Sequence, residues 1–395
     1  MRATRFTGIL VAILALTLTG CSAPTLRQTP LFSDSPAVFA YYENDGSGGL
    51  EALNASIGQP MWKTHFGNMY ANSYSSAVMA NGVVYGIADH NFSSVGAAEH
   101  APPAPSVIAV RASDGKLLWR VSVPKPGDAP IIAADASIVA LFVNGECYGF
   151  DPATGKQRWH IAEGGYPQLM RHGIIYVNGS TSLWAVRASD GARLWQTPFD
   201  YSFRPLVGND HALYAGGYGT VLGWDAHTGQ PLTSDSPYAV GDKTGTHSGF
   251  PMAATEKVVL LAINKTRPLD MQAFSAVDGH LLWEVPLSLT GDASLALTCC
   301  IRIVGDFIYI IDGSNGITAL RVRDGSLAWR QDYPDYAVYA FSVSGGVVFA
   351  LLRANSPGPC YLDCGDRIVA LDATSGASSW RRDVEGAGFF PLPAQ

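Results

Sequence analysis

Short runs of apolar residues, separated by glycine-containing turns, recur from residue 37 almost to the end of the chain. Residues 166–197 show this most clearly, with strand-like runs at 167–171, 174–177, 182–187 and 193–197. His172-Gly173 separates the first two runs, and Ser189-Asp190-Gly191 separates the last two. Runs of this length bounded by turn residues are typical of β-strands. The pattern therefore predicts four antiparallel strands joined by tight turns.

The same unit occurs eight times, and each copy contains a glycine followed four residues later by a marker position. The marker is tryptophan in seven copies: Gly58/Trp62, Gly115/Trp119, Gly155/Trp159, Gly191/Trp195, Gly279/Trp283, Gly325/Trp329 and Gly376/Trp380. The copy at Gly229 has Thr233 instead. Six residues before each glycine lies a small residue, and an apolar residue follows it. Three aligned constraints over eight units establish an internal repeat.

Successive repeat glycines are 36 to 57 residues apart, a spacing that favours the blades of a β-propeller. We expect the tryptophan on the outer strand of each blade, with its ring packed over the small residue of the neighbouring strand. The repeat resembles the PQQ-like repeat, in which docked tryptophans link adjacent blades. The resemblance covers about residues 37–395. It implies an all-β, eight-bladed propeller of four-stranded antiparallel blades.

The two ends of the repeat region indicate how the ring closes. The first copy has two strand-like runs, 37–42 and 50–54, before its tryptophan strand, and no obvious innermost one. After Trp380 the chain supplies one more segment, 388–393, with no further unit. We therefore expect this C-terminal segment to join the first blade as its inner strand.

The first 36 residues have a different character from the repeats. Arg2 and Arg5 precede an apolar run at 9–18 that is too short to cross a bilayer, which predicts a signal peptide at 1–20. Leu18-Thr19-Gly20-Cys21 resembles the bacterial lipobox, which implies that Cys21 is lipidated; the alternative is an ordinary signal peptide with a chance cysteine. Residues 21–36 are rich in Ser, Thr and Pro and indicate a flexible tether. We thus expect an extracytoplasmic, lipid-anchored propeller at 37–395, on the outer membrane of a Gram-negative host or otherwise on the outer leaflet of the cell membrane.

Composition agrees with a turn-rich β protein and excludes two other classes. The chain has 42 glycines, 24 prolines and only 15% charged residues, which argues against helical bundles. Its formal net charge is −7, and removal of residues 1–20 deletes two arginines and no acid, giving −9. No basic footprint for nucleic acid is present.

Long insertions gather at one end of the predicted blades. With strands A to D counted outward from the channel, insertions at 89–105, 264–271 and 353–366 fall between B and C, and one at 234–249 falls between D and A. These connections emerge on the same side of an up-and-down sheet, here named the loop face. The opposite side, with short A–B and C–D turns, is named the turn face. Binding groups favour loops on a rigid scaffold, so the loop face is the candidate surface for an envelope or membrane partner.

The cysteines add three hypotheses. Cys360 and Cys364 bracket the tip of one insertion and are candidates for a disulfide, which an extracytoplasmic setting permits. Cys299 and Cys300 form a vicinal pair at the start of a predicted inner strand, near the channel, either as a rare vicinal disulfide or as two buried small residues. Cys147 is expected to be a free or buried thiol.

Two functions from different classes follow. In architecture the chain resembles the BamB lipoproteins of the β-barrel assembly machinery, which implies a non-enzymatic docking scaffold with no bound cofactor. No catalytic or metal-ligating set is identified. The alternative is a quinoprotein dehydrogenase that uses PQQ and Ca²⁺. Those enzymes also have eight such blades and pack a vicinal disulfide on the quinone, which would give Cys299 and Cys300 a role.

Overall fold

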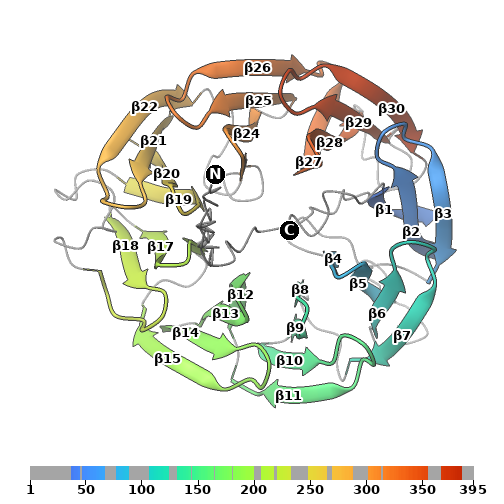
Figure 1. Cartoon of the computed structure of the whole chain (residues 1–395), viewed down its shortest axis with the longest axis horizontal. Helices are drawn as coiled ribbons and strands as arrows, with labels where there is room; N and C mark the ends of the chain where they lie inside the picture. Colours follow the sequence, from blue (N-terminus) through green and yellow to red (C-terminus); the bar gives the residue numbers. More distant parts are fainter. Residues whose placement is uncertain are drawn as a thin grey trace, which may run out of the picture.

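The computed structural model describes the repeat region in fifteen segments: 37–44, 47–66, 77–88, 106–123, 131–143, 145–163, 165–179, 181–199, 206–217, 220–232, 248–264, 269–287, 301–312, 315–354 and 366–384. The strands in these segments form eight separate antiparallel sheets, and the segments contain no helix. The sheets stand around a common axis as the blades of a propeller (Figure 1). The predicted eight-bladed, all-β fold is confirmed.

The blades follow one another in chain order. Blade 1 consists of β1 (Ala37–Asn44), β2 (Ser47–Asn54) and β3 (Pro60–His65), and blade 2 of β4 (Ala77–Ala80), β5 (Val83–Ala88), β6 (Ser106–Arg111) and β7 (Leu117–Ser122). Blade 3 consists of β8 (Ile131–Ala134), β9 (Val139–Val143), β10 (Glu146–Phe150) and β11 (Gln157–Ile161), and blade 4 of β12 (Tyr166–Arg171), β13 (Ile174–Asn178), β14 (Ser182–Arg187) and β15 (Arg193–Pro198). Blade 5 consists of β16 (Leu206–Gly208), β17 (Ala212–Gly217) and β18 (Thr220–Asp225), and blade 6 of β19 (Ser248–Ala254), β20 (Val258–Asn264), β21 (Leu269–Ser275) and β22 (Leu281–Leu287). Blade 7 consists of β23 (Ile301–Val304), β24 (Phe307–Asp312), β25 (Gly316–Arg321) and β26 (Leu327–Asp332), and blade 8 of β27 (Tyr336–Ser344), β28 (Val347–Ala354), β29 (Asp366–Asp372) and β30 (Ser378–Val384).

Six blades have four described strands, and blades 1 and 5 have three. In blade 1 the described strands are B, C and D, and the segment predicted to supply strand A, 388–393, lies outside the described residues. In blade 5 the described strands are A, B and C. A single bridge between Trp224 and Pro231 marks the start of the fourth.

Each repeat tryptophan lies opposite the small residue of its own blade, as predicted. Trp119 pairs with Ala109, Trp195 with Ala185 and Trp380 with Ala370 across the C and D strands. In blade 3 the small residue is Gly149, and a Cβ there would lie 2.0 Å from Cε2 of Trp159. The small residues therefore leave the space that the indole ring fills.

The tryptophan ring also reaches the next blade, where it lies against the repeat glycine of that blade. A Cβ on Gly115 would lie 2.5 Å from Cε3 of Trp62, and φ of Gly115 is +72°. Only glycine adopts this left-handed conformation at low cost while leaving room for a ring. Each G-x-x-x-W segment therefore takes part in two contacts. Its glycine lies against the tryptophan of the preceding blade, and its own tryptophan docks on the glycine of the following blade.

A hydrogen bond fixes each docked ring. The indole Nε1 donates to the backbone carbonyl three residues before the glycine of the next blade. The seven bonds measure 2.8 to 3.1 Å and join Trp62 to Ala112, Trp119 to Pro152, Trp159 to Ala188, Trp195 to Ala226, Trp283 to Val322, Trp329 to Ala373 and Trp380 to Ala55. Each bond satisfies a donor that is largely removed from water.

An aromatic residue on strand B supports several of the docked rings. Tyr85, Tyr176 and Tyr309 lie 5.8 to 6.0 Å from Trp119, Trp195 and Trp329, measured between ring centroids. The Tyr309 hydroxyl donates to the carbonyl of Ala373, which also accepts from Trp329. Burial raises the pKa of Tyr309 to about 12. The recurring aromatic at the third position of strand B is a sequence signal that the repeat analysis missed.

The hydrophobic core lies between the blades. Eight clusters of buried residues each join two neighbouring sheets, and together they run around the ring. Blade 8 meets blade 1 in the same way as any other pair: Leu53 packs with Phe349 and Ile368, and the Trp380 indole bonds Ala55 across 325 residues of sequence. The described residues therefore already show the contact that closes the ring.

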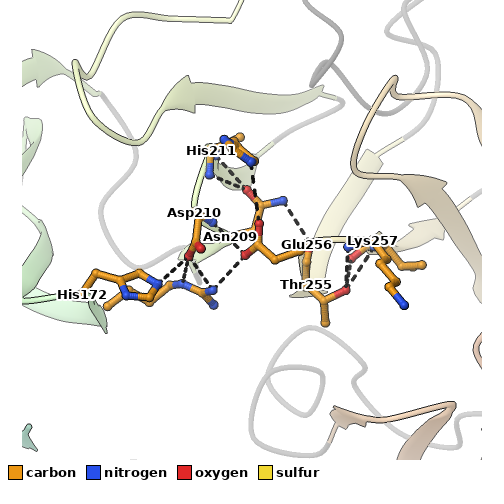
Figure 2. A network of polar contacts seen from close by, with 10 residues as sticks. His172, Asn209, Asp210, His211, Thr255, Glu256 and Lys257 are labelled. Carbon is orange, nitrogen blue, oxygen red and sulfur yellow. Dashed lines mark hydrogen bonds and ion pairs between the residues drawn. The ribbon is translucent and has the colours of Figure 1, made fainter. Parts of the chain in front are cut away.

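The junction between blades 5 and 6 is held differently. Its cluster includes no tryptophan among the described residues, in agreement with Thr233 at the marker position, which itself lies outside them. Polar groups on the A–B turns join these blades instead (Figure 2). Asn209 Nδ2 donates to the carbonyl of Thr255 at 3.0 Å, and the amide of Asp210 donates to Glu256 Oε1 at 3.0 Å.

Arg171 of blade 4 extends this network over three blades. Its Nη2 lies 2.7 Å from Asp210 Oδ1 and 2.8 Å from Glu256 Oε1. His172 Nε2 lies 2.8 Å from the same Asp210 oxygen. Burial alone would raise the pKa of Asp210, but the hydrogen bond and charge of Arg171 outweigh it, and the pKa lies below its ordinary value.

Gly115→Ala tests the docking contact, with Gly82→Ala as the matched control. Both glycines have φ of +72°, but a Cβ on Gly82 would meet nothing within 4 Å. Gly82→Ala should lower the free energy of unfolding by about 1–2 kcal/mol through backbone strain. Gly115→Ala should cost about 1–3 kcal/mol more, because the new methyl collides with Trp62. Denaturant unfolding measures both, and equal losses would contradict the docking contact.

Arg171→Met tests the network between blades 4, 5 and 6. We expect a loss of about 1–2 kcal/mol at pH 7, because three charged hydrogen bonds, two to Asp210 and one to Glu256, disappear at a partly exposed site. Arg187→Met, which removes an exposed pair with Asp190, should cost at most about 0.5 kcal/mol.

The pH dependence of the same variant provides a second readout. The pKa of Asp210 is lower in the folded protein than its ordinary value of about 3.9. Its contribution to the free energy of unfolding is therefore complete above that ordinary value and is lost as the pH falls through the folded pKa. The gap between wild type and Arg171→Met should therefore close in acid. A gap that widens below pH 4 would contradict the assignment.

Candidate functional site

The strand bounds agree with one predicted insertion and change the bounds of the other three, which themselves lie outside the described residues. Asn264 is the last residue of β20. β5 ends at Ala88 and β6 begins at Ser106, so the first B–C connection spans 89–105. Residues 269–271 belong to β21, 248–249 to β19, and 353–354 and 366 to β28 and β29. The insertions are therefore 265–268, 355–365 and a D–A connection that ends at 247. The strands are therefore longer than the sequence pattern predicts. Polar residues at their ends, such as Ser248 and Asn264, still form pairs in the sheet.

Several predicted site residues lie outside the described residues. These are the lipidation site Cys21, the candidate disulfide Cys360 and Cys364, and the candidate vicinal pair Cys299 and Cys300. The vicinal pair immediately precedes Ile301, where the described inner strand β23 begins. Cys147 is described: it is a buried free thiol on β10, and burial raises its pKa well above the ordinary value.

The base of the insertion at 355–365 is the best-defined part of the loop face. Arg353 is the penultimate residue of β28, and Asp366 is the first residue of β29. Two contacts of 3.4 Å join the guanidinium Nε and Nη2 to the two carboxylate oxygens. The Asp366 side chain is only 3% exposed. This ion pair therefore clamps the two ends of the insertion to the sheet.

Tyr339 completes this group on the neighbouring strand. The register of β27 shifts between Val338 and Ala340, so Tyr339 lies at a bulge, where a side chain is re-aimed. The Arg353 guanidinium carbon lies 4.4 Å from the Tyr339 ring centroid, and Tyr339 is 40% exposed. Arg353 is thus held on one side by a carboxylate and on the other by an aromatic face.

A second arginine–tyrosine pair lies on the same blade. The Arg367 guanidinium carbon is 5.1 Å from the Tyr336 ring centroid, and Arg367 Nε donates to Asp383. That hydrogen bond and the positive charge hold the pKa of Asp383 below its ordinary value. Tyr336 pairs with Ala354 and Asp366 pairs with Val384, which places both arginine–tyrosine pairs near the loop-face end of blade 8.

These four side chains lie near the loop-face end of blade 8 and are named the blade 8 patch: Tyr336, Tyr339, Arg353 and Arg367. Arg367 pairs with Leu352 and lies with Tyr336 on the side of the sheet that packs on blade 7, whereas Arg353 and Tyr339 lie on the side towards blade 1. Tyrosine and arginine are the types that dominate binding energy at protein interfaces. Their ion pairs and ring contacts already fix the rotamers, so little conformational freedom remains to be lost on binding. The sequence analysis missed the patch, although opposite charges at the two ends of one insertion, Arg353 and Asp366, were a usable signal.

Two searches of the described segments gave negative results. No group of three or more His, Cys, Asp or Glu side chains is arranged there to hold a metal ion. Those segments also contain no helix of the length and apolarity needed to span a bilayer.

Comparison with known proteins identifies the family. A family profile described as outer membrane protein assembly factor BamB matches residues 46–202 and 179–350. These matches cover most of the repeat region. The chain belongs to this family.

Individual relatives are distant. BamB of Burkholderia pseudomallei is 24% identical over 182 residues, which are 43% of this chain and 43% of that protein. Tetrathionate hydrolase of Acidithiobacillus ferrooxidans is 21% identical over 337 residues, covering 74% of this chain and 64% of the relative. The chain therefore spans less than two thirds of the length of these curated relatives. The quinohemoprotein alcohol dehydrogenase ADHIIG of Pseudomonas putida shares the fold, with a TM-score of 0.50, 13% identity, and coverage of 82% of this chain and 68% of that one.

Titration of Asp383 tests the geometry of the blade 8 patch. Arg367→Met should raise the pKa of Asp383 toward its ordinary value of about 3.9, because the hydrogen bond and nearest charge are removed. Arg381→Met, which removes only a weaker electrostatic contribution, should raise it less. Carboxyl carbon NMR across the acid range measures both, and an unchanged pKa in Arg367→Met would contradict the observed pairing.

Proposed function

We propose that this member of the BamB family is a lipid-anchored extracytoplasmic protein whose propeller is a non-enzymatic docking scaffold for an envelope protein. The blade 8 patch is the observation that carries the proposal. It offers exposed tyrosine and ion-paired arginine at the base of an insertion, on the face that also carries the other long connections.

The many contacts between neighbouring blades support the proposed scaffold function. Seven indole hydrogen bonds and eight interblade clusters hold the sheets against one another, and the last blade packs on the first. A surface built on such a frame keeps its shape before the partner arrives, which lowers the entropy cost of association. The tight turns of the opposite face leave the longer connections to determine which partner is recognised.

The predicted anchor fits the same function. Lipid chains on Cys21 would hold the protein at the membrane surface, and residues 21–36 would separate the ring from the lipid. A docking surface on such a tether meets other envelope proteins at high local concentration. We propose the outer membrane as the location in a Gram-negative host.

The alternative is a dehydrogenase that uses PQQ and Ca²⁺. The vicinal cysteines Cys299 and Cys300 favour it, because such dehydrogenases pack a vicinal disulfide on the quinone. The pair directly precedes Ile301, the first residue of the inner strand β23, and lies outside the described segments.

A photocrosslinking residue at Tyr339 tests the docking surface in the native envelope. We expect one defined protein to be crosslinked from position 339. Position 194 is the matched control, because Leu194 is also exposed, at 38%, but lies on the outer strand of blade 4. Arg353→Ala should reduce recovery of that protein at least several-fold, since truncating an interface hot spot costs 2 kcal/mol or more.

Two experimental outcomes would overturn the proposed scaffold function. Equal recovery from positions 339 and 194 would contradict the assigned face. A bound quinone spectrum and dye reduction after addition of PQQ and Ca²⁺ to the purified protein would establish the dehydrogenase instead.

A further inference from the structure

The large apolar side chains that the described segments expose gather on the turn face. Eleven are exposed, and ten of them lie in a C–D turn, at the start of an outer strand D or at the end of an inner strand A. All three places are at the turn-face end of a blade. Tyr339, in the blade 8 patch, is the exception. Exposed apolar side chains gathered in this way mark sites for proteins or membranes.

The repeat places most of these side chains at one height on the ring. Leu117, Leu281 and Leu327 each come two residues after a repeat glycine and begin the outer strand of their blade. Met61 and Leu282 come one residue further along their strands. Since the blades are equivalent units around one axis, side chains at the same repeat position lie in one plane across the turn face.

Nine of the ten side chains form two groups in different parts of the ring. The first group, in blades 1 and 2, contains Ile57, Met61, Leu117 and Leu118. The second group, in blades 6 and 7, contains Val277, Leu281, Leu282, Val304 and Leu327. β22 of the second group lies across the ring from β7 of the first (Figure 1).

This arrangement favours a flat partner. A typical protein interface covers about 800 Å² per partner in one patch, and the residues that dominate its energy cluster near its centre. On the turn face the inner positions are held mostly by polar A–B turns, among them those of Asp135, Arg171 and Asp210, whereas most of the apolar side chains lie on outer strands. The surface of a bilayer, in contrast, touches both groups at once.

The chain enters the described part of the propeller from the same face. β1 is strand B of blade 1 and begins at Ala37, which pairs with Asn54. Asn54 accepts from the amide of Ile57 in the C–D turn, so β1 begins beside the first apolar group. The segment from Cys21 to Ala37 spans at most about 55 Å when extended. A bilayer that holds a lipidated Cys21 can thus lie directly under the turn face, whereas contact with the loop face would require this segment first to run the height of the ring.

The charged groups next to these side chains are compensated. Four aspartates share a C–D turn with exposed apolar side chains, and each is paired with a basic side chain at 2.5 to 3.0 Å: Asp114 with Arg111, Asp190 with Arg187, Asp278 with His280 and Asp324 with Arg323. Little uncompensated negative charge therefore faces the headgroups, although the chain as a whole is acidic.

We propose that the turn face rests on a phospholipid bilayer, with the two apolar groups inserted among the headgroups and the loop face directed away from the membrane. The inference rests on the proposed lipid anchor and deepens it. The anchor alone would leave the ring free to rotate on its tether, whereas apolar side chains buried about 5–10 Å into the interface fix its orientation. The blade 8 patch is then presented to envelope proteins and not to lipid.

Photocrosslinking to lipid vesicles tests the orientation. The purified mature chain carries a photocrosslinking residue at position 118, 282 or 122 and is mixed with vesicles of phosphatidylcholine, a neutral lipid that attracts no charge. We expect phospholipid adducts, detected by mass spectrometry, from positions 118 and 282. Position 122 is the matched control, because Ser122 is also exposed but ends β7 at the loop-face side, whereas Leu118 lies near its turn-face start.

Two sets of variants separate the turn face from the loop face. Leu281→Ser combined with Leu282→Ser should lower the adduct yield from position 327 about three- to tenfold, because two apolar side chains no longer enter the interface. Tyr339→Ser should leave that yield unchanged. Unchanged thermal unfolding shows that each variant is folded, as expected for exposed positions.

The lipid anchor is tested separately. Cys21→Ser cannot be acylated, and it should give the same pattern of adducts at lower yield. An equal yield, with no acyl mass on the unmodified chain, would contradict the proposed anchor and leave the turn-face contact standing.

Three results would overturn the turn-face contact: no phospholipid adduct from either position 118 or position 282, an equal yield from positions 118 and 122, or capture of one defined protein from positions 118 and 282 in the native envelope. Capture of a protein from position 339 is independent of all three, so the orientation and the docking function can fail separately.

Discussion

The whole ring depends on one contact, in which an indole ring packs on a left-handed glycine in the turn of the next blade. The glycine needs positive φ to turn the chain and must lack a side chain to admit the ring, so two constraints coincide at one position. The indole hydrogen bond then fixes the distance between neighbouring sheets. Repeated at seven of the eight junctions between blades, this contact sets how the described sheets stand relative to their neighbours.

The one junction without a described docked tryptophan shows what else the fold requires there. Blades 5 and 6 share a small apolar cluster, and a polar network on the turn face adds direct bonds between their A–B turns. Arg171 carries the network back to blade 4, so one side chain links the turns of three consecutive blades.

The sequence predicted the fold well because the docking contact is local in each repeat: Gly115 and Trp119 are four residues apart, and the pattern recurs eight times. The blade 8 patch was not predicted, because Arg367 and Tyr336 meet across a sheet and no motif links their positions. The polar network of Arg171, Asp210 and Glu256 was not predicted for the same reason, since its members come from three repeats. Sequence periodicity reveals contacts that repeat, whereas sites arise where individual repeats differ.

Hydrogen exchange of the indole N–H groups tests the central claim most directly. If docked tryptophans form one continuous ring, the seven Nε1–H groups should be protected together, with exchange governed by global unfolding. Trp380 is decisive, because its bond to Ala55 joins the last blade to the first. Protection of Trp380 equal to that of Trp119 and Trp329 is the expected result. Fast exchange at Trp380 alone, with the other six protected, would contradict a ring closed by this contact.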